Sequence, residues 1–372
     1  MRKTCFKYRL YPSHCQEATM KHTLEECRWL YNHFLEQRKN LWERDQQPIS
    51  LYEQERALPK LKQERPSLNT VHSQVFQNVA VRIDLAFKAF FRRTKAGETP
   101  GYPRFRGANR YDSFTYPQGG FSFVDGRLRL SKIGNIKIKL HRPIVGDIKT
   151  LTISRSATNK WYACFSCESE TIVLPEANER VGIDVGLASF ATLSTGEQVA
   201  NPRFFRTDEK ALAKAQRKMC KFKKGTMERV KPKKVVSHIH ERITNRRYDF
   251  SHKLSRSIVN RFGVIAIEDL SINRMVHNHC LAKSITDAAW GQFTASLAYK
   301  AENAGRQFVA VNPAYTSQDC SKCGHRQSTP LSEREFHCPC CGLILNRDHN
   351  ASLNILAIGL DSLGLAPRSP CL

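Results

Sequence analysis

Two short cysteine segments constrain this chain more than any other feature. Each segment, Cys320–Gly324 and Cys338–Gly342, has a cysteine at its first and fourth position and glycine directly after, and fourteen residues separate Cys323 from Cys338. Four thiolates at this spacing are typical of a closed tetrahedral zinc site. A redox Cys-x-x-Cys motif is the rival interpretation, but the paired arrangement favours structural zinc on Cys320, Cys323, Cys338 and Cys341, with Cys340 left over. Because all four positions are filled, such a zinc would organise a loop and do no catalysis.

The charge balance narrows the class of partner. Lys and Arg number 59 against 34 Asp and Glu, a net charge of +25. An excess of this size favours a polyanion, usually nucleic acid. No apolar run approaches the roughly 18–20 residues of a bilayer span. The first ten residues also lack an apolar segment of signal-peptide length, so we expect a cytoplasmic protein with no membrane partner.

The first half of the chain reads as helices followed by strands. A short strand over residues 3–10 precedes a long amphipathic helix, whose apolar residues recur at three- and four-residue steps from Met20 to Phe34. Further helices are predicted over residues 51–64 and 70–93. After a Gly- and Pro-rich stretch, five strands are predicted over residues 121–124, 127–130, 135–142, 148–155 and 160–166. Their number and spacing predict a small β-barrel, closed by the N-terminal strand.

The second half reads as an α/β domain. Its strands are predicted over residues 181–186, 189–194, 263–267 and 307–311. Helices are predicted over residues 202–222, 233–261, 285–304 and 350–357. The whole chain is therefore expected to be a multidomain α+β protein.

Three acidic residues lie at unusual places in this second half. Asp184 sits within an apolar strand, Glu268 ends another, and Asp348 opens the final helix. Each has an ordinary explanation, such as an ion pair for Glu268 or an N-cap for Asp348. Together they have the arrangement of RNase H-like nucleases. Hard oxygen ligands suit two Mg²⁺ or Mn²⁺ ions that activate water and stabilise the leaving oxygen. Asp184 would bridge the ions, and Asp269 ranks below Glu268.

Several basic and amide side chains are candidates for nucleic-acid contacts. Basic residues crowd the two helices between residues 202 and 261, where a solvated helix face is the alternative reading. On the barrel, lysines occupy outward positions. Amides near the start of the helix over residues 70–93 could read adenine edges, although idle surface amides are as common. The candidates are Ser73, Gln74, Gln77, Asn78, Lys137, Lys139, Arg217, Lys221, Lys224, Arg246 and Arg247.

The chain resembles TnpB, also called OrfB, the transposon-encoded RNA-guided nuclease family related to type V CRISPR effectors. The likeness runs through Phe6–Pro12, Tyr31-Asn32, Val75–Phe91, Gly182–Gly186, Ile267–Leu270, Trp290–Phe293, Tyr315–Gly324 and Arg347–Ile355. The last two segments in tandem are the most specific. The family usually has Asp where this chain has Asn346. Because the matching catalytic acid is Asp348, this difference does not predict loss of activity.

The resemblance implies an architecture and an activity. The implied segments are 1–12, the first strand of an OB-like wedge barrel; 13–97, a helical recognition lobe; 98–178, the barrel itself; 179–315, a RuvC-like nuclease domain; 316–345, a zinc-ribbon insert; 346–359, the last RuvC segment; and 360–372, a loose tail. The implied activity is cleavage of double-stranded DNA beside a short motif, directed by a guide RNA from the transposon end. A guided repressor that does not cut, a DNA transposase, an accessory factor and a zinc-dependent RNA-binding protein remain alternatives. The oligomeric state is open.

Overall fold

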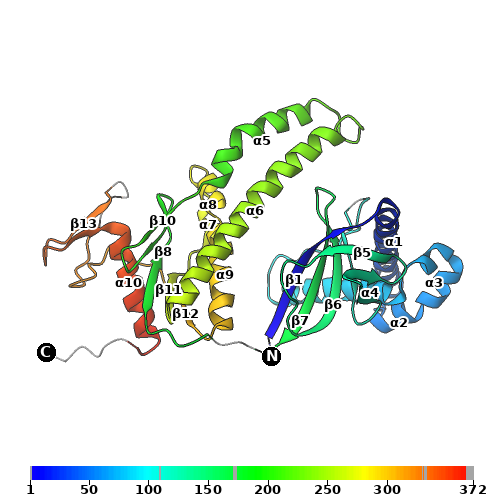
Figure 1. The fold of residues 1–372 in the computed structure, drawn as a ribbon, viewed down its shortest axis with the longest axis horizontal. Coiled ribbons are helices and arrows are strands. Elements are labelled where there is room, and N and C mark those ends of the chain that lie inside the picture. Colours follow the sequence, from blue (N-terminus) through cyan, green and yellow to red (C-terminus); the bar gives the residue numbers. More distant parts are fainter. Residues whose placement is uncertain (1, 109, 171–173, 329, 331–332, 366–372) are drawn as a thin grey trace. The chain divides into compact units, whose positions relative to one another are not determined.

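The computed structural model describes residues 2–108, 110–170, 174–328, 330 and 333–365, and its contacts divide the chain into two compact units, Met1–Glu170 and Thr171–Leu372 (Figure 1). The predicted tail after residue 359 is helical as far as Ser362, and its residues 366–372 lie outside the described part. None of the described helices combines the length and apolarity needed to cross a membrane.

The first unit is built on a seven-stranded sheet in the order β2-β6-β7-β1-β5-β4-β3. The strands are β1 (Arg2–Tyr11), β2 (Ser113–Tyr116), β3 (Phe121–Val124), β4 (Arg127–Leu130), β5 (Gly134–Lys139), β6 (Asp147–Arg155) and β7 (Trp161–Ser169). In β1, Phe6, Tyr8 and Leu10 are buried while Lys3, Cys5 and Lys7 are exposed, the two-residue period of a strand with one covered face. Of these seven strands, only β2 was not predicted from the sequence.

The predicted Asp-Gly hairpin is confirmed, but the predicted closure of the barrel by the N-terminal strand is wrong. Asp125 and Gly126 both have positive φ, 48° and 68°, as expected for an Asp-Gly turn between paired strands. The N-terminal strand does not close the barrel, because β1 lies in the middle of the sheet between β7 and β5. The barrel is nearly closed elsewhere: Tyr116 on one edge strand packs against Phe121 on the other, with 6.4 Å between ring centroids.

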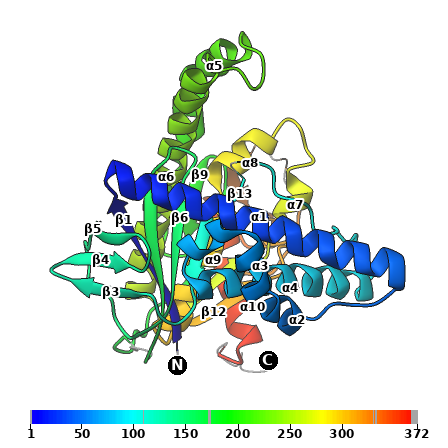
Figure 2. The same ribbon diagram turned by 90° about the vertical axis from the view of Figure 1, so that its right-hand side faces the viewer.

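Helices cover this sheet and share its core. They are α1 (His14–Asp45), α2 (Leu51–Arg56), α3 (Leu58–Glu64), a 3₁₀ turn (Pro66–Thr70) and α4 (Ser73–Lys95), with α1 crossing the unit as one long helix (Figure 2). Ser13 and Gln16 form a reciprocal capping box at the start of α1. Apolar residues of α1 and α4 belong to the same buried cluster as those of the strands. The predicted helical lobe and barrel therefore have one common core.

The second unit contains a five-stranded sheet in the order β10-β9-β8-β11-β12. Its strands are β8 (Arg180–Asp184), β9 (Ser189–Leu193), β10 (Gln198–Ala200), β11 (Val264–Glu268) and β12 (Gln307–Val311). β8, β11 and β12 run parallel, and β9 is antiparallel to β8. Both faces of β8 and β11 are covered, which explains their continuous apolar sequences.

The last helix, α10 (Arg347–Ser362), lies directly against the parallel strands. Two glycines permit this close approach. A Cβ at Gly182 would collide with the carbonyl oxygen of Ser352, and one at Gly359 would lie 2.6 Å from the Cβ of Ala266. The helix starts before and ends after the predicted residues 350–357.

The remaining helices form two groups: an arm made of α5 (Phe204–Cys220) and α6 (Val230–Arg261), and three shorter helices, α7 (Ile272–Met275), α8 (Ala282–Ala288) and α9 (Trp290–Asn303). The arm is a long hairpin that extends beyond the sheet (Figure 1). The three shorter helices follow β11. The single helix predicted over residues 285–304 is wrong, because Ala289 has a positive φ of 55° and separates α8 from α9. Strands β13 (Glu335–His337) and β14 (Ile344–Asn346) pair within the cysteine segment.

Candidate functional site

Asp184 and Glu268 end neighbouring parallel strands. Ile183 is paired with Ile267, so the two acids follow at adjacent positions on the same sheet edge. The pKa of Asp184 is raised to about 8, mainly by burial and further by the negative charges of Glu268 and Asp348, while Arg347 acts in the opposite direction. A carboxyl perturbed by burial and by like charges is typical of a functional site.

Glu268 is held by one specific contact. Burial raises its pKa, and the buried Thr316 hydroxyl donates a 2.6 Å hydrogen bond to its carboxylate, which works in the opposite direction. The neighbouring Asp269 is exposed. Glu268 and Asp269 therefore have different surroundings.

The alternative explanation of Asp348 as a helix cap is wrong. The N-cap of α10 is Asn346, whose Oδ1 accepts hydrogen bonds from the backbone N–H groups of Asp348 and His349 at 3.0 and 3.2 Å. Asp and Asn are equally good N-caps, which explains why Asn can stand at this position. The Asp348 side chain is then available for another role, beside Asp184.

The three carboxylates are neighbours but do not form a closed ligand set. Among the residues that the structure describes, only the four cysteines bring three or more potential ligand atoms within 4.8 Å of one another. The negative charges of Glu268 and Asp348 act unfavourably on an ionised Asp184, and a divalent cation bound between them would offset this repulsion. The donor set itself, three carboxylates and no sulfur or imidazole, fits Mg²⁺ or Mn²⁺.

The raised pKa of Asp184 predicts a pH-dependent stability in metal-free protein. Protonated Asp184 stabilises the fold fully below its unfolded pKa near 3.8, and this contribution is lost as pH rises toward 8. Asp184→Asn should therefore unfold at a higher temperature than wild type. The difference in the free energy of unfolding should grow from pH 5 to pH 8 and reach on the order of a few kcal/mol.

Thermal unfolding in a chelating buffer checks this expectation, and added Mg²⁺ should narrow the difference. Asp361→Asn, which removes an exposed carboxyl from α10, is the matched control and should change nothing. Equal unfolding temperatures for Asp184→Asn and wild type at pH 8.5 would contradict the expected ionisation.

The four candidate zinc ligands converge. The Sγ atoms of Cys320 and Cys341 are 3.6 Å apart, and those of Cys323 and Cys338 are 3.5 Å apart. Thiolates about 2.3 Å from one tetrahedral zinc ion lie about 3.8 Å from one another, so the arrangement fits the metal. The exposed Cys340 is outside the cluster. Gly324 and Gly342 have φ of 73° and 68°, which explains the glycine after each pair.

Two asparagines of α10 tie this cysteine module, residues 316–345, to the acids. Nδ2 of the fully buried Asn350 donates to the Asp319 carbonyl at 2.8 Å, and its Oδ1 accepts from the Ser321 N–H at 2.9 Å. Asn354, one turn later, donates to the carbonyls of Thr316 and Asp319 at 2.8 and 2.7 Å. These two asparagines were not predicted from the sequence, although their four-residue spacing, close to Asp348, indicates that they share one face of the helix.

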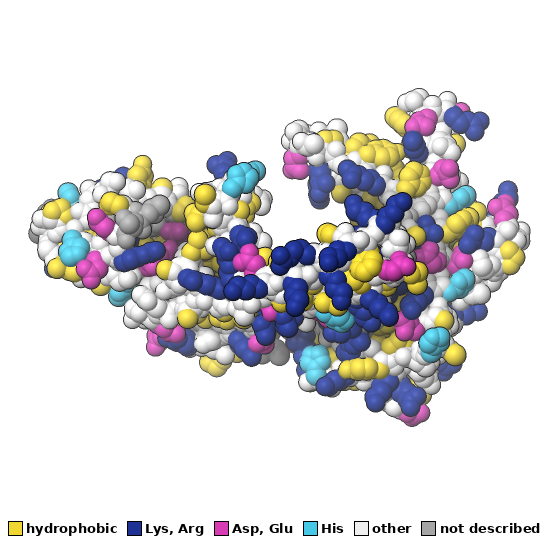
Figure 3. Space-filling view, turned by 90° about the horizontal axis from the view of Figure 1, so that it is seen from above, with side chains coloured by type: hydrophobic (Ala, Val, Ile, Leu, Met, Phe, Trp, Pro, Cys, Tyr) yellow, Lys and Arg dark blue, Asp and Glu magenta, His cyan; other side chains and the backbone are white. Residues whose placement is uncertain are grey.

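The predicted basic side chains of the arm are in two different situations. Arg217, Lys221 and Lys224 are exposed near its tip, and Lys and Arg gather over the arm in the space-filling view (Figure 3). By contrast, Arg246 is paired with Asp208 at 3.5 Å. Arg247 is 19% exposed and is paired with Asp287 at 2.9 Å. Arg246 joins α6 to α5 and Arg247 joins α6 to α8, so both guanidinium groups are engaged within the protein.

The predicted positions in the first unit also differ from one another. Lys137 and Lys139 are exposed on β5 and lie across from Tyr11 and Arg9 of β1. At the start of α4, the Ser73 hydroxyl accepts from Lys62, the Gln74 carbonyl from the Gly119 N–H, and the Asn78 carbonyl from Arg82. The fourth predicted side chain of α4, Gln77, is exposed and has no hydrogen bond with any residue described by the structure.

Comparisons with known sequences give matches along the chain. Residues 164–279 match the family described as "Probable transposase" (OrfB_IS605), and residues 290–355 match "Cas12f1-like, TNB domain". A Streptomyces pristinaespiralis protein is 36% identical over 367 residues, covering 96% of this chain and 90% of that relative. The chain belongs to the TnpB (OrfB) family. The resemblance found in the sequence is thereby confirmed.

The relatives carry consistent names. The Streptomyces protein and InsQ of Escherichia coli K12, which is 33% identical over 96% of this chain and 92% of its own, are both named "Putative RNA-guided DNA endonuclease". Cas12f1 of Sulfoacidibacillus thermotolerans, a "CRISPR-associated endodeoxyribonuclease", is 29% identical over 55% of this chain and 52% of its own. A solved Cas12f1–sgRNA–target DNA complex superposes with a TM-score of 0.38 at 16% identity, covering 96% of this chain and 99% of that one.

One family description differs from the observed structure. Residues 1–47 of this TnpB-family protein match a profile described as a helix-turn-helix domain. The described residues of that range form the strand β1 and the whole of a single helix, α1, of 32 residues. The segment contributes a central barrel strand and a core helix.

Proposed function

We propose that this protein is an RNA-guided DNA endonuclease and that its second unit is an RNase H-like, RuvC-type nuclease domain. The observation that carries the proposal is the place of the mostly buried Asp184, at the end of β8 beside Glu268 and Asp348, where burial and the two like charges raise its pKa to about 8. A buried acid kept beside two others, at the carboxyl ends of parallel strands, favours a site that is completed by cations.

The acids would divide the work at the scissile phosphate. Two divalent ions, when bound, would supply an activated water and stabilise the leaving oxygen. Asp184, on the central strand, is our candidate for the ligand shared by both ions, with Glu268 and Asp348 as flanking ligands. Thr316 orients the Glu268 carboxylate through its hydrogen bond, and Asn346 keeps Asp348 free of the helix cap.

We assign the cysteine module to a structural zinc ion. The converging sulfur atoms of Cys320, Cys323, Cys338 and Cys341 support this assignment. Through Thr316 and the two asparagines of α10, the zinc would fix the loop that holds Glu268 relative to the helix that carries Asp348. Its function is then to position the acids, without contact with the substrate.

Guide RNA and target DNA are the proposed partners. The names of the relatives and the net charge of +25 support them. The exposed Arg217, Lys221 and Lys224 of the arm, with Lys137 and Lys139 of the barrel, would bind phosphates and supply affinity without sequence preference. Gln77, at the start of α4, is our remaining candidate for reading bases of the adjacent motif. The guide would come from the transposon end.

The RNA that copurifies with the protein tests this proposal. Protein expressed together with its own flanking DNA should retain one defined RNA that maps to the transposon end and continues into adjoining sequence. Sequencing of the bound RNA measures this. A mixture that mirrors total cellular RNA would contradict a guided enzyme and favour a transposase or a non-specific binder.

A further inference from the structure

A polar cavity of about 460 Å³ lies in the second unit, between the base of the arm and α8. Its lining is formed by Leu187, Asn201, Arg203, Arg206, Ser284 and Asp287. We propose that this cavity binds a backbone phosphate of the DNA strand being cut, with Arg203 as its main contact. This inference rests on the proposed function, since it names a substrate-binding group beside the acidic site.

The cavity is close to Asp184 along the chain. Leu187 follows Asp184 by three residues, a separation of at most about 11 Å in extended chain. Asn201 fixes this turn, because its Nδ2 donates to the Leu187 carbonyl at 3.1 Å. A strand that crosses the acids would therefore pass the cavity within a short distance.

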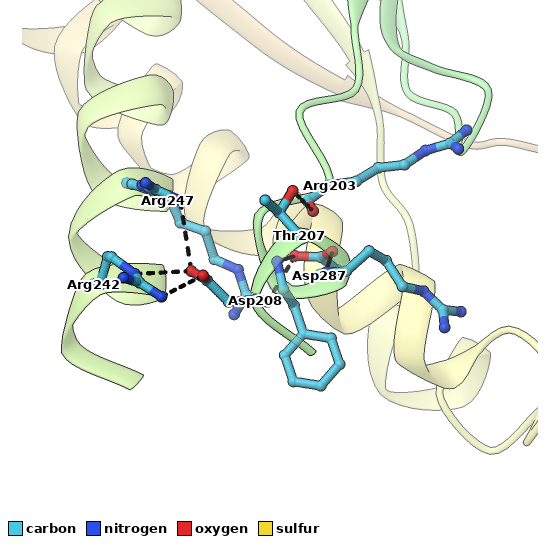
Figure 4. A network of polar contacts seen from close by, with 9 residues as sticks. Arg203, Thr207, Asp208, Arg242, Arg247 and Asp287 are labelled. Carbon is cyan, nitrogen blue, oxygen red and sulfur yellow. Dashed lines mark hydrogen bonds and ion pairs between the residues drawn. The ribbon is translucent and has the colours of Figure 1, made fainter. Parts of the chain in front are cut away.

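Asp287 is the single acid in the lining, and hydrogen bonds and an ion pair compensate its negative charge. Asp287 is almost fully buried and accepts hydrogen bonds from the backbone N–H groups of Phe205 and Arg206 at 2.8 and 3.1 Å. It is also paired with Arg247 at 2.9 Å, and Figure 4 shows it within this network beneath the first turn of α5. Asp287 thus caps α5 from a neighbouring helix, and its charge does not repel an anion.

Cations exceed acids around the cavity. Arg206 is paired with Glu209 at 3.2 Å and reaches Ser284 Oγ at 3.3 Å, while Lys283 is paired with the same glutamate at 2.6 Å. Counting the network behind them, three acids face six cations: Asp208, Glu209 and Asp287 against Arg203, Arg206, Arg242, Arg246, Arg247 and Lys283.

Arg203 is the unpaired member of this group. Its side chain makes no ion pair or hydrogen bond with any residue described by the structure, and in Figure 4 it extends away from the acids. Its backbone lies in the left-handed region, with φ 47° and ψ 49°, a costly conformation for a residue with a side chain. A guanidinium group fits phosphate oxygens with two parallel hydrogen bonds, so a phosphodiester is the ligand that suits it.

Replacement of Arg203 tests the proposal in the complete protein–RNA complex. Arg203→Gln should cut a matched plasmid about 10- to 100-fold more slowly, the effect of losing a charged hydrogen bond. Its unfolding temperature and its affinity for guide RNA should stay at wild-type values. Arg203→Lys should recover part of the rate, and Arg203→Gln should lower the salt dependence of cleavage by about one unit of slope.

The matched control is Lys210→Ala, which removes an exposed cation of α5 that does not line the cavity. It should cut at the wild-type rate. A wild-type rate for Arg203→Gln would overturn the inference, as would equal losses in the two variants. If wild type itself cuts nothing, the proposed function fails before this inference is reached, so the two failures are distinguishable.

Discussion

Asp184→Ala is expected to abolish DNA cleavage and to leave guide RNA and target binding at wild-type levels. The side chain is the proposed ligand shared by two cations, and the loss of several kcal/mol of transition-state stabilisation corresponds to about 1,000-fold or more in rate. Cleavage of a matched plasmid in Mg²⁺ measures the first effect, and a mobility shift with matched DNA measures the second.

The other acids supply an internal control. Glu268→Gln should resemble Asp184→Ala, because it keeps the shape of the side chain and the contact to Thr316 but removes the charge. Asp269→Asn, at the adjacent exposed position, should cut normally. An active Glu268→Gln, or an inactive Asp269→Asn that folds normally, would show that the acidic site is assigned incorrectly.

Cys338→Ser is expected to release the zinc and to reduce cleavage by about 100-fold or more. A structural zinc site contributes directly to folding, so its loss should disorder the module. The loop 316–321 would then lose the register that Asn350 and Asn354 impose on it, and Glu268 would lose the Thr316 hydrogen bond. Metal analysis of the purified protein and plasmid cleavage measure the two effects.

Cys340→Ser is the matched control for the zinc prediction. It removes the surplus thiol of the same segment, which lies outside the cluster. The variant should keep one zinc per chain and full cleavage. Zinc loss in Cys340→Ser, or full cleavage by zinc-free Cys338→Ser, would contradict the proposed role of the module.

Local patterns in the sequence predicted the elements that depend on local rules. The strands β11 and β12 are short apolar runs bounded by turns, and their predicted positions agree with the structure to within a residue. The Asp125-Gly126 turn follows from the preference of these residues for positive φ. The convergence of Cys320, Cys323, Cys338 and Cys341 agrees with their spacing.

The misses have different physical origins. The break at Ala289 has no Gly or Pro at that position to mark it, although Ala289 has a positive φ of 55°. The edge strands β2 and β10 have four and three residues and were not predicted, whereas the equally short β3 and β4 were, because they flank the Asp125-Gly126 turn. Periodicity could not show that Arg246 and Arg247 serve acids from other helices, Asp208 and Asp287, because ion pairs across helices leave no mark on spacing.

The arrangement of the acids could be predicted only in part. The sequence placed Asp184 within one strand and Glu268 at the end of another. In the structure β8 ends at Asp184, and the register of the parallel strands brings the two acids side by side. The role of Asn346 as the cap of α10, and the clamp formed by Asn350 and Asn354, required the structure. These contacts join residues of α10 to loops distant in the chain.

Programmed cleavage tests the central proposal most directly. The protein is purified with its own RNA and with a variant RNA whose guide segment is replaced, and each complex is offered both matched plasmids in Mg²⁺. We predict that each complex linearises only the plasmid matching its guide, and that neither cuts when Asp184 is replaced by Ala. Cutting that ignores the guide, or binding to the matched plasmid without any cutting by wild type under Mg²⁺ or Mn²⁺, would contradict an RNA-guided endonuclease.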